Sequence, residues 1–254
     1  MTHDPKADLA APHKIVILNP KGGSGKTTLA TNIAAYYALE GPPPTLIDCD
    51  PGGYSMRWVD SRSPDRPPVY GIAAYDQGGA NAGPIGAWPE SKTVIVDLPA
   101  GLQPHQYFRQ TYDADSILIP VLPSEIDIYS ATRFIADLLL VAQFDRRNRS
   151  LAIVANRTRH TTRSYRMLKR FLQSLEIPVV TELRDSQAYV HAAAQGIGII
   201  EMPRYLVGQD IDGLAGLFGW LERYRTRRID GLIVEELRQR PEMSLTGARP
   251  IVTH

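Results

Sequence analysis

Short apolar runs alternate along the chain with longer segments of helical periodicity. The runs have the length and the β-branched content of strands that are buried on both faces. They occupy residues 15–18, 45–47, 93–96, 116–119, 151–154 and 179–180. The main helical segments are residues 27–40, 130–143 and 162–175. This alternation predicts an α/β fold, with a doubly wound, mostly parallel sheet that carries helices on both faces.

One domain accounts for most of the chain. We expect it to span residues 13–240, with a flexible arm over residues 1–12 and a flexible tail over residues 241–254. Residues 61–92 are rich in Pro, Gly and Asp, and we predict that they are its least regular part. Ligands of parallel sheets bind at the carboxyl ends of the strands, so we expect the functional residues to lie at these ends.

Composition narrows the class of protein. The chain has 254 residues, 43% of them apolar and 22% charged, which is typical of a soluble globular protein. Its single cysteine, Cys49, cannot form an internal disulfide or a cysteine-rich metal or iron–sulfur site. No secretion signal and no run of membrane-spanning length is present. We therefore expect a cytoplasmic protein.

A glycine-rich turn separates the first predicted strand from the first predicted helix. It reads Lys21-Gly22-Gly23-Ser24-Gly25-Lys26-Thr27-Thr28. The backbone N–H groups of such a turn wrap the phosphates of a nucleotide. Lys26 then reaches the β- and γ-phosphates and the Thr27 hydroxyl ligates Mg²⁺, so the expected cofactors are ATP and Mg²⁺.

The extra lysine at the start of this turn carries a family resemblance. With Lys21 the turn resembles that of the deviant Walker A ATPases of the ParA/MinD type, whose pattern is Lys-Gly-Gly-x-Gly-Lys-Ser/Thr. The resemblance implies a homodimer on ATP, in which Lys21 reaches across to the nucleotide of the partner. It also implies weak intrinsic hydrolysis of ATP to ADP and phosphate, with Lys21, Lys26 and Asp50 as the catalytic residues.

Two further predicted strands end in carboxylates. Residues 46–53 resemble the family's switch I motif, which implies that Asp48 supports the Mg²⁺ shell and that Asp50 orients the attacking water. Residues 94–101 resemble Walker B and switch II, which places Asp97 in the outer shell of the metal. Acids suit both roles, because Mg²⁺ prefers hard oxygen ligands and the water needs an acceptor. We interpret Cys49 as a small buried side chain.

Later segments extend the resemblance over most of the chain. Residues 114–124 and 184–203 are similar to the corresponding family segments, and residues 154–157 resemble the one whose asparagine recognises adenine, here Asn156. The chain departs from the family at Pro20, which replaces the usual Gln, and at Leu98-Pro99-Ala100, which replaces Thr-Pro-Pro. Neither departure removes a phosphate-binding group.

Basic residues gather in an acid-free stretch between Asp145 and Glu176. They are Arg146, Arg147, Arg149, Arg157, Arg159, Arg163, Arg166, Lys169 and Arg170. On a helix, Arg159, Arg163, Arg166 and Arg170 share one face, opposite an apolar face formed by Leu168, Phe171, Leu172 and Leu175. Such a stripe predicts contact with the phosphates of nonspecific DNA.

Other features bear on the same prediction. Arg204 lies where related ATPases place a DNA-contacting arginine, and a further basic group comprises Arg223, Arg225, Arg227 and Arg228. About a dozen residues precede the first strand, so we expect no helix-turn-helix domain there and binding through the DNA backbone.

The resemblance implies a ParA-like ATPase that positions or segregates a cellular cargo on the nucleoid. A cargo-linked partner stimulates hydrolysis in this scheme, and the cargo is a carboxysome, a plasmid or chromosome, or a protein cluster. A MinD-like membrane-cycling ATPase is the first alternative, but Glu235 and Glu236 interrupt the apolar spacing of residues 229–237, which we expect to pack against the domain. A metabolic ATP-dependent ligase on the same scaffold is the second.

Overall fold

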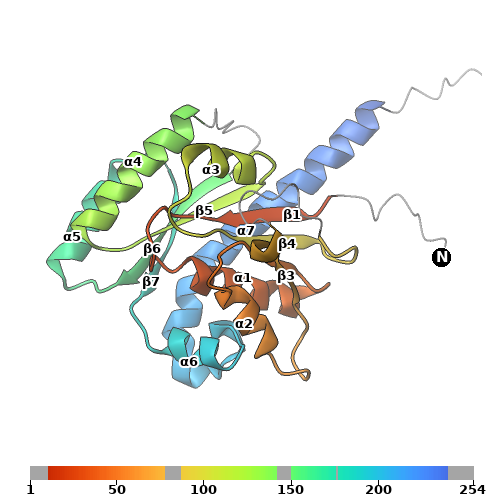
Figure 1. Cartoon of the computed structure of the whole chain (residues 1–254), viewed down its shortest axis with the longest axis horizontal. Coiled ribbons are helices and arrows are strands. Elements are labelled where there is room, and N and C mark those ends of the chain that lie inside the picture. Colours follow the sequence, from red (N-terminus) through yellow and green to blue (C-terminus); the bar gives the residue numbers. More distant parts are fainter. Residues whose placement is uncertain (1–10, 78–86, 142–149, 176, 240–254) are drawn as a thin grey trace, which may run out of the picture.

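The computed structural model describes residues 11–77, 87–141, 150–175 and 177–239 (Figure 1). Nearly all of the expected arm and the expected tail lies outside these residues. So do Arg146, Arg147 and Arg149 of the basic stretch. The described residues form one seven-stranded sheet with helices on both faces, as the strand and helix pattern predicts.

Every strand pair of the sheet is parallel, and the strand order is β3-β2-β4-β1-β5-β6-β7. The strands are β1 (His13–Ile17), β2 (Thr45–Asp48), β3 (Tyr70–Ala73), β4 (Thr93–Asp97), β5 (Ser116–Val121), β6 (Ser150–Thr158) and β7 (Val179–Arg184). The last residues of β2, β4 and β1 are aligned in register, Asp48 with Asp97 and Ile17 with Asp97. The two carboxylates predicted from the sequence are therefore neighbours beside the glycine-rich loop.

Seven α-helices are described, with two short 3₁₀ turns. The helices are α1 (Lys26–Glu40), α2 (Tyr54–Asp60), α3 (Pro104–Thr111), α4 (Glu125–Val141), α5 (Arg163–Gln173), α6 (Ala188–Ala194) and α7 (Arg204–Gln239). The 3₁₀ turns are η1 (Ala74–Gln77) and η3 (Ile199–Glu201). Helices α3, α4 and α5 cover one face of the sheet, and α1, α2, α6 and α7 cover the other.

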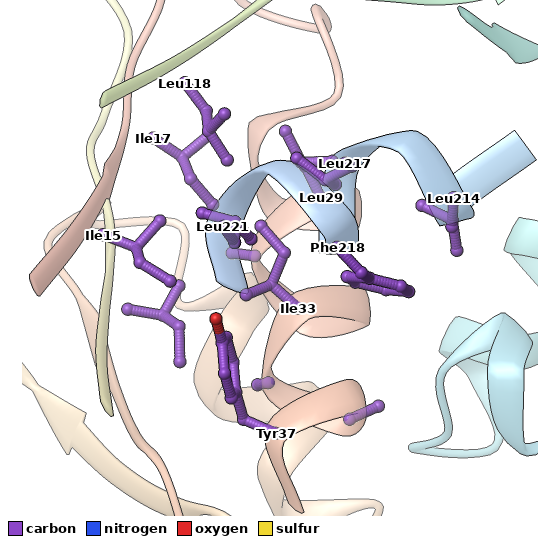
Figure 2. Close-up of a cluster of buried hydrophobic side chains, with 14 of the residues drawn as sticks. Ile15, Ile17, Leu29, Ile33, Tyr37, Leu118, Leu214, Leu217, Phe218 and Leu221 are labelled. Carbon is purple, nitrogen blue, oxygen red and sulfur yellow. The ribbon is translucent and has the colours of Figure 1, made fainter. Parts of the chain in front are cut away.

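Alternate residues of β1 enter different halves of the core. Ile15 and Ile17 pack with α1 and α7, whereas Val16 and Leu18 pack on the side of α3, α4 and α5. Figure 2 shows the first half, in which Leu29, Ile33 and Tyr37 of α1 lie in one cluster with side chains of β1 and α7. From α7, this cluster includes the buried side chains of Leu214, Leu217, Phe218 and Leu221. The helix predicted over residues 27–40 is thus confirmed, and most of its residues are buried.

Two boundaries differ from the sequence prediction. The segment expected to be irregular contains β3, an edge strand whose four residues are all only partly buried, so it lacks the continuous apolar run of the inner strands. Helix α4 begins at Glu125, five residues before the predicted start at residue 130. Its first turn alternates the acids Glu125 and Asp127 with isoleucines. The acids favour a helix N-terminus through the helix dipole, but the alternation hides the helical periodicity.

Helix α7 is long and bent. Its backbone departs from helical geometry at Val207 (φ −132°, ψ 19°) and then continues to Gln239. Figure 1 shows its last turns projecting from the body of the domain past β1. The side chains of residues 229–237 are not among those described, so their packing against the domain stays a prediction. Within the described residues, no helix has the length and apolar content to cross a membrane.

Candidate nucleotide site

The loop between β1 and α1 has the backbone of a phosphate-binding turn. Gly23 (φ 76°) and Gly25 (φ 98°) lie in the left-handed region, which glycine enters without steric cost. No described side chain caps the start of α1, and the buried Ser24 hydroxyl has no partner among the described residues. An open helix N-terminus with unpaired polar groups suits anionic oxygens. The loop therefore has the geometry to bind a nucleotide phosphate.

Lys26 folds back over the loop. Its ammonium group donates to the carbonyl oxygens of Asn19, at 3.3 Å, and of Lys21, at 3.4 Å. Burial lowers the pKa of Lys26, an effect that the carboxylates of Asp97 and Asp50 partly offset. A buried ammonium held only by long hydrogen bonds is available to a stronger acceptor, such as a phosphate oxygen.

Lys21 points away from the loop, toward α4. Its Nζ lies 2.6 Å from Oδ2 of Asp127, and the same oxygen accepts a short hydrogen bond from the Ser124 hydroxyl. The Lys21 side chain is 35% exposed, whereas that of Asp127 is 4% exposed. The backbone N–H of Lys21 is held by Asn19 Oδ1 at 2.8 Å. Lys21 therefore lies at the accessible rim of the site, held by a carboxylate of its own subunit.

Asp97 lies at the centre of the site. Its Oδ2 accepts hydrogen bonds from Thr27 Oγ1, at 2.7 Å, and from Ser55 Oγ, at 2.8 Å. Its Oδ1 is buried and has no partner among the described residues. Burial is the largest cause of a rise in the pKa of Asp97 to about 7. An oriented acid next to the Thr27 hydroxyl fits a site for a hard cation.

Asp48 is fully buried, and its carboxylate accepts hydrogen bonds from the backbone that follows β2. Its two oxygens accept the N–H groups of Asp50, at 3.0 Å, and of Met56, at 3.1 Å. Burial raises the pKa of Asp48, although these hydrogen bonds oppose the rise. Asp48 thus shapes the switch I turn in this structure. Asp50 is partly exposed, and its Oδ1 accepts the N–H of Gly52 at 2.9 Å.

Cys49 lies between these two acids in the sequence but faces the core. It is 1% exposed, and burial raises the pKa of its thiol to about 12. A thiol with that pKa stays protonated at neutral pH and is a poor nucleophile. This agrees with its interpretation as a small buried side chain.

Asn156 reaches the phosphate loop from the end of β6. Its Nδ2 donates to the Ser24 carbonyl at 2.8 Å, and a Cβ added to Gly25 would lie 2.0 Å from this nitrogen. Arg157, which follows, adopts φ 50°, and its N–H donates to Asn156 Oδ1. A small pocket lies beside Asn156, and its lining includes Thr28, Asn32 and Tyr189. Asn156 is placed to contact a group bound next to the loop.

Two residues of this site, Ser55 and Asp127, were not predicted from the sequence. Neither belongs to a motif, and each meets its partner through a contact between distant segments. Their only sequence signals are their places, one just after the switch I turn and the other in the first turn of a helix. The predicted residues Lys21, Lys26, Thr27 and Asp97 do lie together around the loop.

The basic stripe is shorter than predicted. Helix α5 begins at Arg163, with Thr162 as its N-cap, so Arg159 lies before the helix and not on its face. Arg159 instead pairs with Asp185 at 2.6 Å, and Arg204 pairs with Asp212 at 2.5 Å. The exposed basic side chains of α5 have no ion-pair partner among the described residues. They are Arg163, Arg166, Lys169 and Arg170.

The apolar face of α5 agrees with the prediction. Leu168 and Leu172 are buried, and Phe171 and Leu175 pack against the same part of the core. Of the second basic group, the side chains of Arg223 and Arg225 are described. Arg223 is exposed, and Arg225 pairs with Glu222 at 3.2 Å. The side chains of Arg227 and Arg228 lie outside the described residues.

A family model described as the CobQ/CobB/MinD/ParA nucleotide binding domain matches residues 15–199. The chain belongs to this family. The matched residues run from β1 to the first residue of η3 and so include the loop, the acids and Asn156. The resemblance to ParA/MinD-type ATPases noted in the sequence is confirmed.

Individual proteins show the same relationship. A maintenance of carboxysome distribution protein A from Halothiobacillus neapolitanus is 30% identical over 189 residues, which are 74% of this chain and 87% of that relative. The ATP complex of a Cyanothece McdA variant has a TM-score of 0.60 at 16% identity and covers 85% of this chain and 97% of that one. MinD from Aquifex aeolicus has a TM-score of 0.59 at 20% identity, covering 82% and 97%. These solved structures confirm the P-loop fold.

Proposed function

We propose that this protein is an ATPase that changes from a monomer to a dimer when it binds ATP and positions a cellular cargo along nonspecific DNA. The observation that carries the proposal is the pair of lysines at the phosphate loop. Lys26 lies over the loop, and Lys21 lies at its accessible rim. The similarity to carboxysome distribution protein A supports a cargo of the carboxysome class.

The residues around the loop fit a nucleotide bound with Mg²⁺. We propose that residues 22–28 hold the phosphates, that Thr27 ligates the metal, and that Asp97 accepts hydrogen bonds from its water shell. The metal neutralises charge on the phosphates when it is bound. The unpaired, buried Oδ1 of Asp97 supports this assignment. Asp48 contributes through the switch I turn, whose backbone it fixes.

We assign the hydrolysis of ATP to Asp50 and the two lysines. Asp50 is on the partly exposed switch I turn and orients the attacking water. Lys26 stabilises charge on the transferred phosphoryl group, and Lys21 reaches the nucleotide of a second subunit after leaving Asp127. Asn156 contacts the adenine, because it lies beside the loop with a hydrogen-bonding amide.

DNA binding is assigned to α5. Arg163, Arg166 and Arg170 share a face with no carboxylate partner in the described part of the chain, and Lys169 is exposed beside them. A dimer presents two such faces, and the doubled set of phosphate contacts strengthens binding to a DNA backbone. Arg159 and Arg204 contribute less, because each already pairs with an aspartate. A cargo-linked partner would release DNA by stimulating hydrolysis.

Co-sedimentation with nonspecific DNA tests the proposal. The protein is incubated with Mg²⁺ and ATP, with ADP, or without nucleotide, at two salt concentrations. We expect pelleting with ATP alone, and less of it at the higher salt concentration. Equal pelleting in all three nucleotide states, or none in any of them, would contradict the DNA-binding switch.

A further inference from the structure

Ser55 brings a second hydroxyl group to the central acid of the site. It belongs to the first turn of α2, is fully buried, and donates from Oγ to Asp97 Oδ2 at 2.8 Å. Thr27 Oγ1 donates to the same oxygen at 2.7 Å. These two hydroxyls come from different elements, one from the phosphate loop side and one from the helix after switch I.

The backbone fixes the position of Ser55. The N–H of the next residue, Met56, donates to Asp48 Oδ2 at 3.1 Å. One turn later, the buried Trp58 donates from its indole nitrogen to the Ile197 carbonyl at 3.2 Å. The first turn of α2 is therefore attached to both acidic strand ends, and the Ser55 hydroxyl is directed at Asp97 by its surroundings.

The two hydroxyls determine which oxygen of Asp97 remains available. Oδ2 accepts both hydrogen bonds, so the carboxylate cannot rotate without breaking them. Oδ1 is left buried, with no partner among the described residues. An oxygen in this state needs a donor, and the water shell of a bound cation supplies donors.

We propose that Ser55 is a positioning residue for magnesium–nucleotide binding, which holds the Asp97 carboxylate so that Oδ1 meets the water shell of the metal. The inference rests on the proposed function, because it takes Mg²⁺ and a nucleotide as the ligands of the loop. It adds a residue outside the loop and the acidic motifs. It also ties α2, and with it switch I, to the metal site.

The test separates metal binding from nucleotide binding. The Ser55→Ala variant and the unchanged protein are titrated with a fluorescent ATP analogue in EDTA and at a series of Mg²⁺ concentrations. In EDTA, we expect the variant and the unchanged protein to bind the analogue with equal affinity. Mg²⁺ should raise the affinity of both, but the variant should need about a tenfold higher Mg²⁺ concentration to reach half of this rise. A residue that only packs α2 would weaken binding equally with and without Mg²⁺.

Ser61→Ala is the matched control. Ser61 lies at the other end of α2, is exposed, and donates to the Arg57 carbonyl at 2.8 Å, so its loss should leave the Mg²⁺ dependence unchanged. The proposal is overturned if Ser55→Ala keeps the Mg²⁺ dependence of the unchanged protein, or if its affinity falls equally in EDTA. If Mg²⁺ has no effect on the unchanged protein, the proposed function fails as well, which is a distinguishable result.

Discussion

Lys21 and Asp127 form an ion pair of 2.6 Å that joins the phosphate loop to the first turn of α4. The lysine that is proposed to reach a second subunit is therefore held by a carboxylate of its own subunit. Asp127 is nearly buried and is also held by Ser124, so the lysine is the partner that can leave. In the dimer that we propose, Lys21 would exchange this carboxylate for a phosphate.

Removing the charge of Asp127 should make dimerisation easier. Asp127→Asn keeps the shape of the side chain but weakens its hold on Lys21, because a partly exposed ion pair contributes about 1 kcal/mol. We expect half-maximal dimerisation at about a fivefold lower ATP concentration, measured by light scattering. Asp113→Asn is the control, since Asp113 pairs with Lys14 at the same distance of 2.6 Å, away from the loop. An unchanged or higher ATP requirement would contradict the exchange.

Asn156 should set the preference for adenine. In Asn156→Ala the amide beside Ser24 and Gly25 is lost, and the hydrogen bond that we propose to the base is lost with it. We expect affinity for ATP to fall about tenfold, as measured by calorimetry, while the weaker affinity for GTP changes little. If ATP and GTP lose affinity by the same factor, Asn156 supports the loop and does not read the base.

Charge reversal on α5 should separate DNA binding from hydrolysis. We predict that Arg163→Glu with Arg166→Glu abolishes DNA co-sedimentation, because phosphate contacts become repulsions. ATP hydrolysis without DNA should survive, since neither residue contacts the loop. The control combines Arg57→Glu with Lys92→Glu, which makes the same change in net charge at exposed positions outside α5. Unchanged DNA affinity in the α5 variant would refute the assignment.

The buried Asp97 should cost stability at neutral pH when no nucleotide is bound. Its pKa is raised to about 7 in the folded protein, so between about pH 4 and pH 7 the folded state binds more protons than the unfolded state. Its contribution to stability therefore falls as the pH rises through this window and is constant above it.

Asp97→Asn removes this dependence. In EDTA, its gain in unfolding free energy over the unchanged protein should grow by about 2.6 kcal/mol between pH 5 and pH 8. Urea unfolding at both pH values measures the gain, and the variant should lose Mg²⁺-dependent nucleotide binding. A gain that does not change with pH would show that Asp97 is ionised throughout this range.

Much of the fold was accessible from local patterns. The runs at residues 15–18 and 93–96 are buried strands because their neighbours cover both faces, and such strands are continuously apolar. Edge strand β3 has no such run, and the alternation of acids and isoleucines in the first turn of α4 conceals the start of that helix. Strands that are buried on both faces were predictable from the sequence. Segments that are only partly buried, such as β3 and the start of α4, were not.

The candidate site divides in a similar way. Lys26, Thr27 and Asp97 were found because short motifs place them at strand ends and in a glycine-rich turn. Ser55 and Asp127 were missed because their partners are 42 and 106 positions away in sequence. The pairing of Arg159 with Asp185 was hidden for the same reason, since only the folded chain brings β6 and β7 together.

Whether Lys21 couples ATP binding to dimerisation can be read from the mass of the protein in solution with ATP. Asp50→Ala is used to block hydrolysis, and light scattering after size-exclusion chromatography is measured with Mg²⁺ and either ATP or ADP. We predict twice the subunit mass with ATP and a single subunit with ADP, and a single subunit under both conditions when Lys21→Ala is added. A protein that remains a single subunit with ATP, or that forms the dimer equally well without Lys21, would contradict the account.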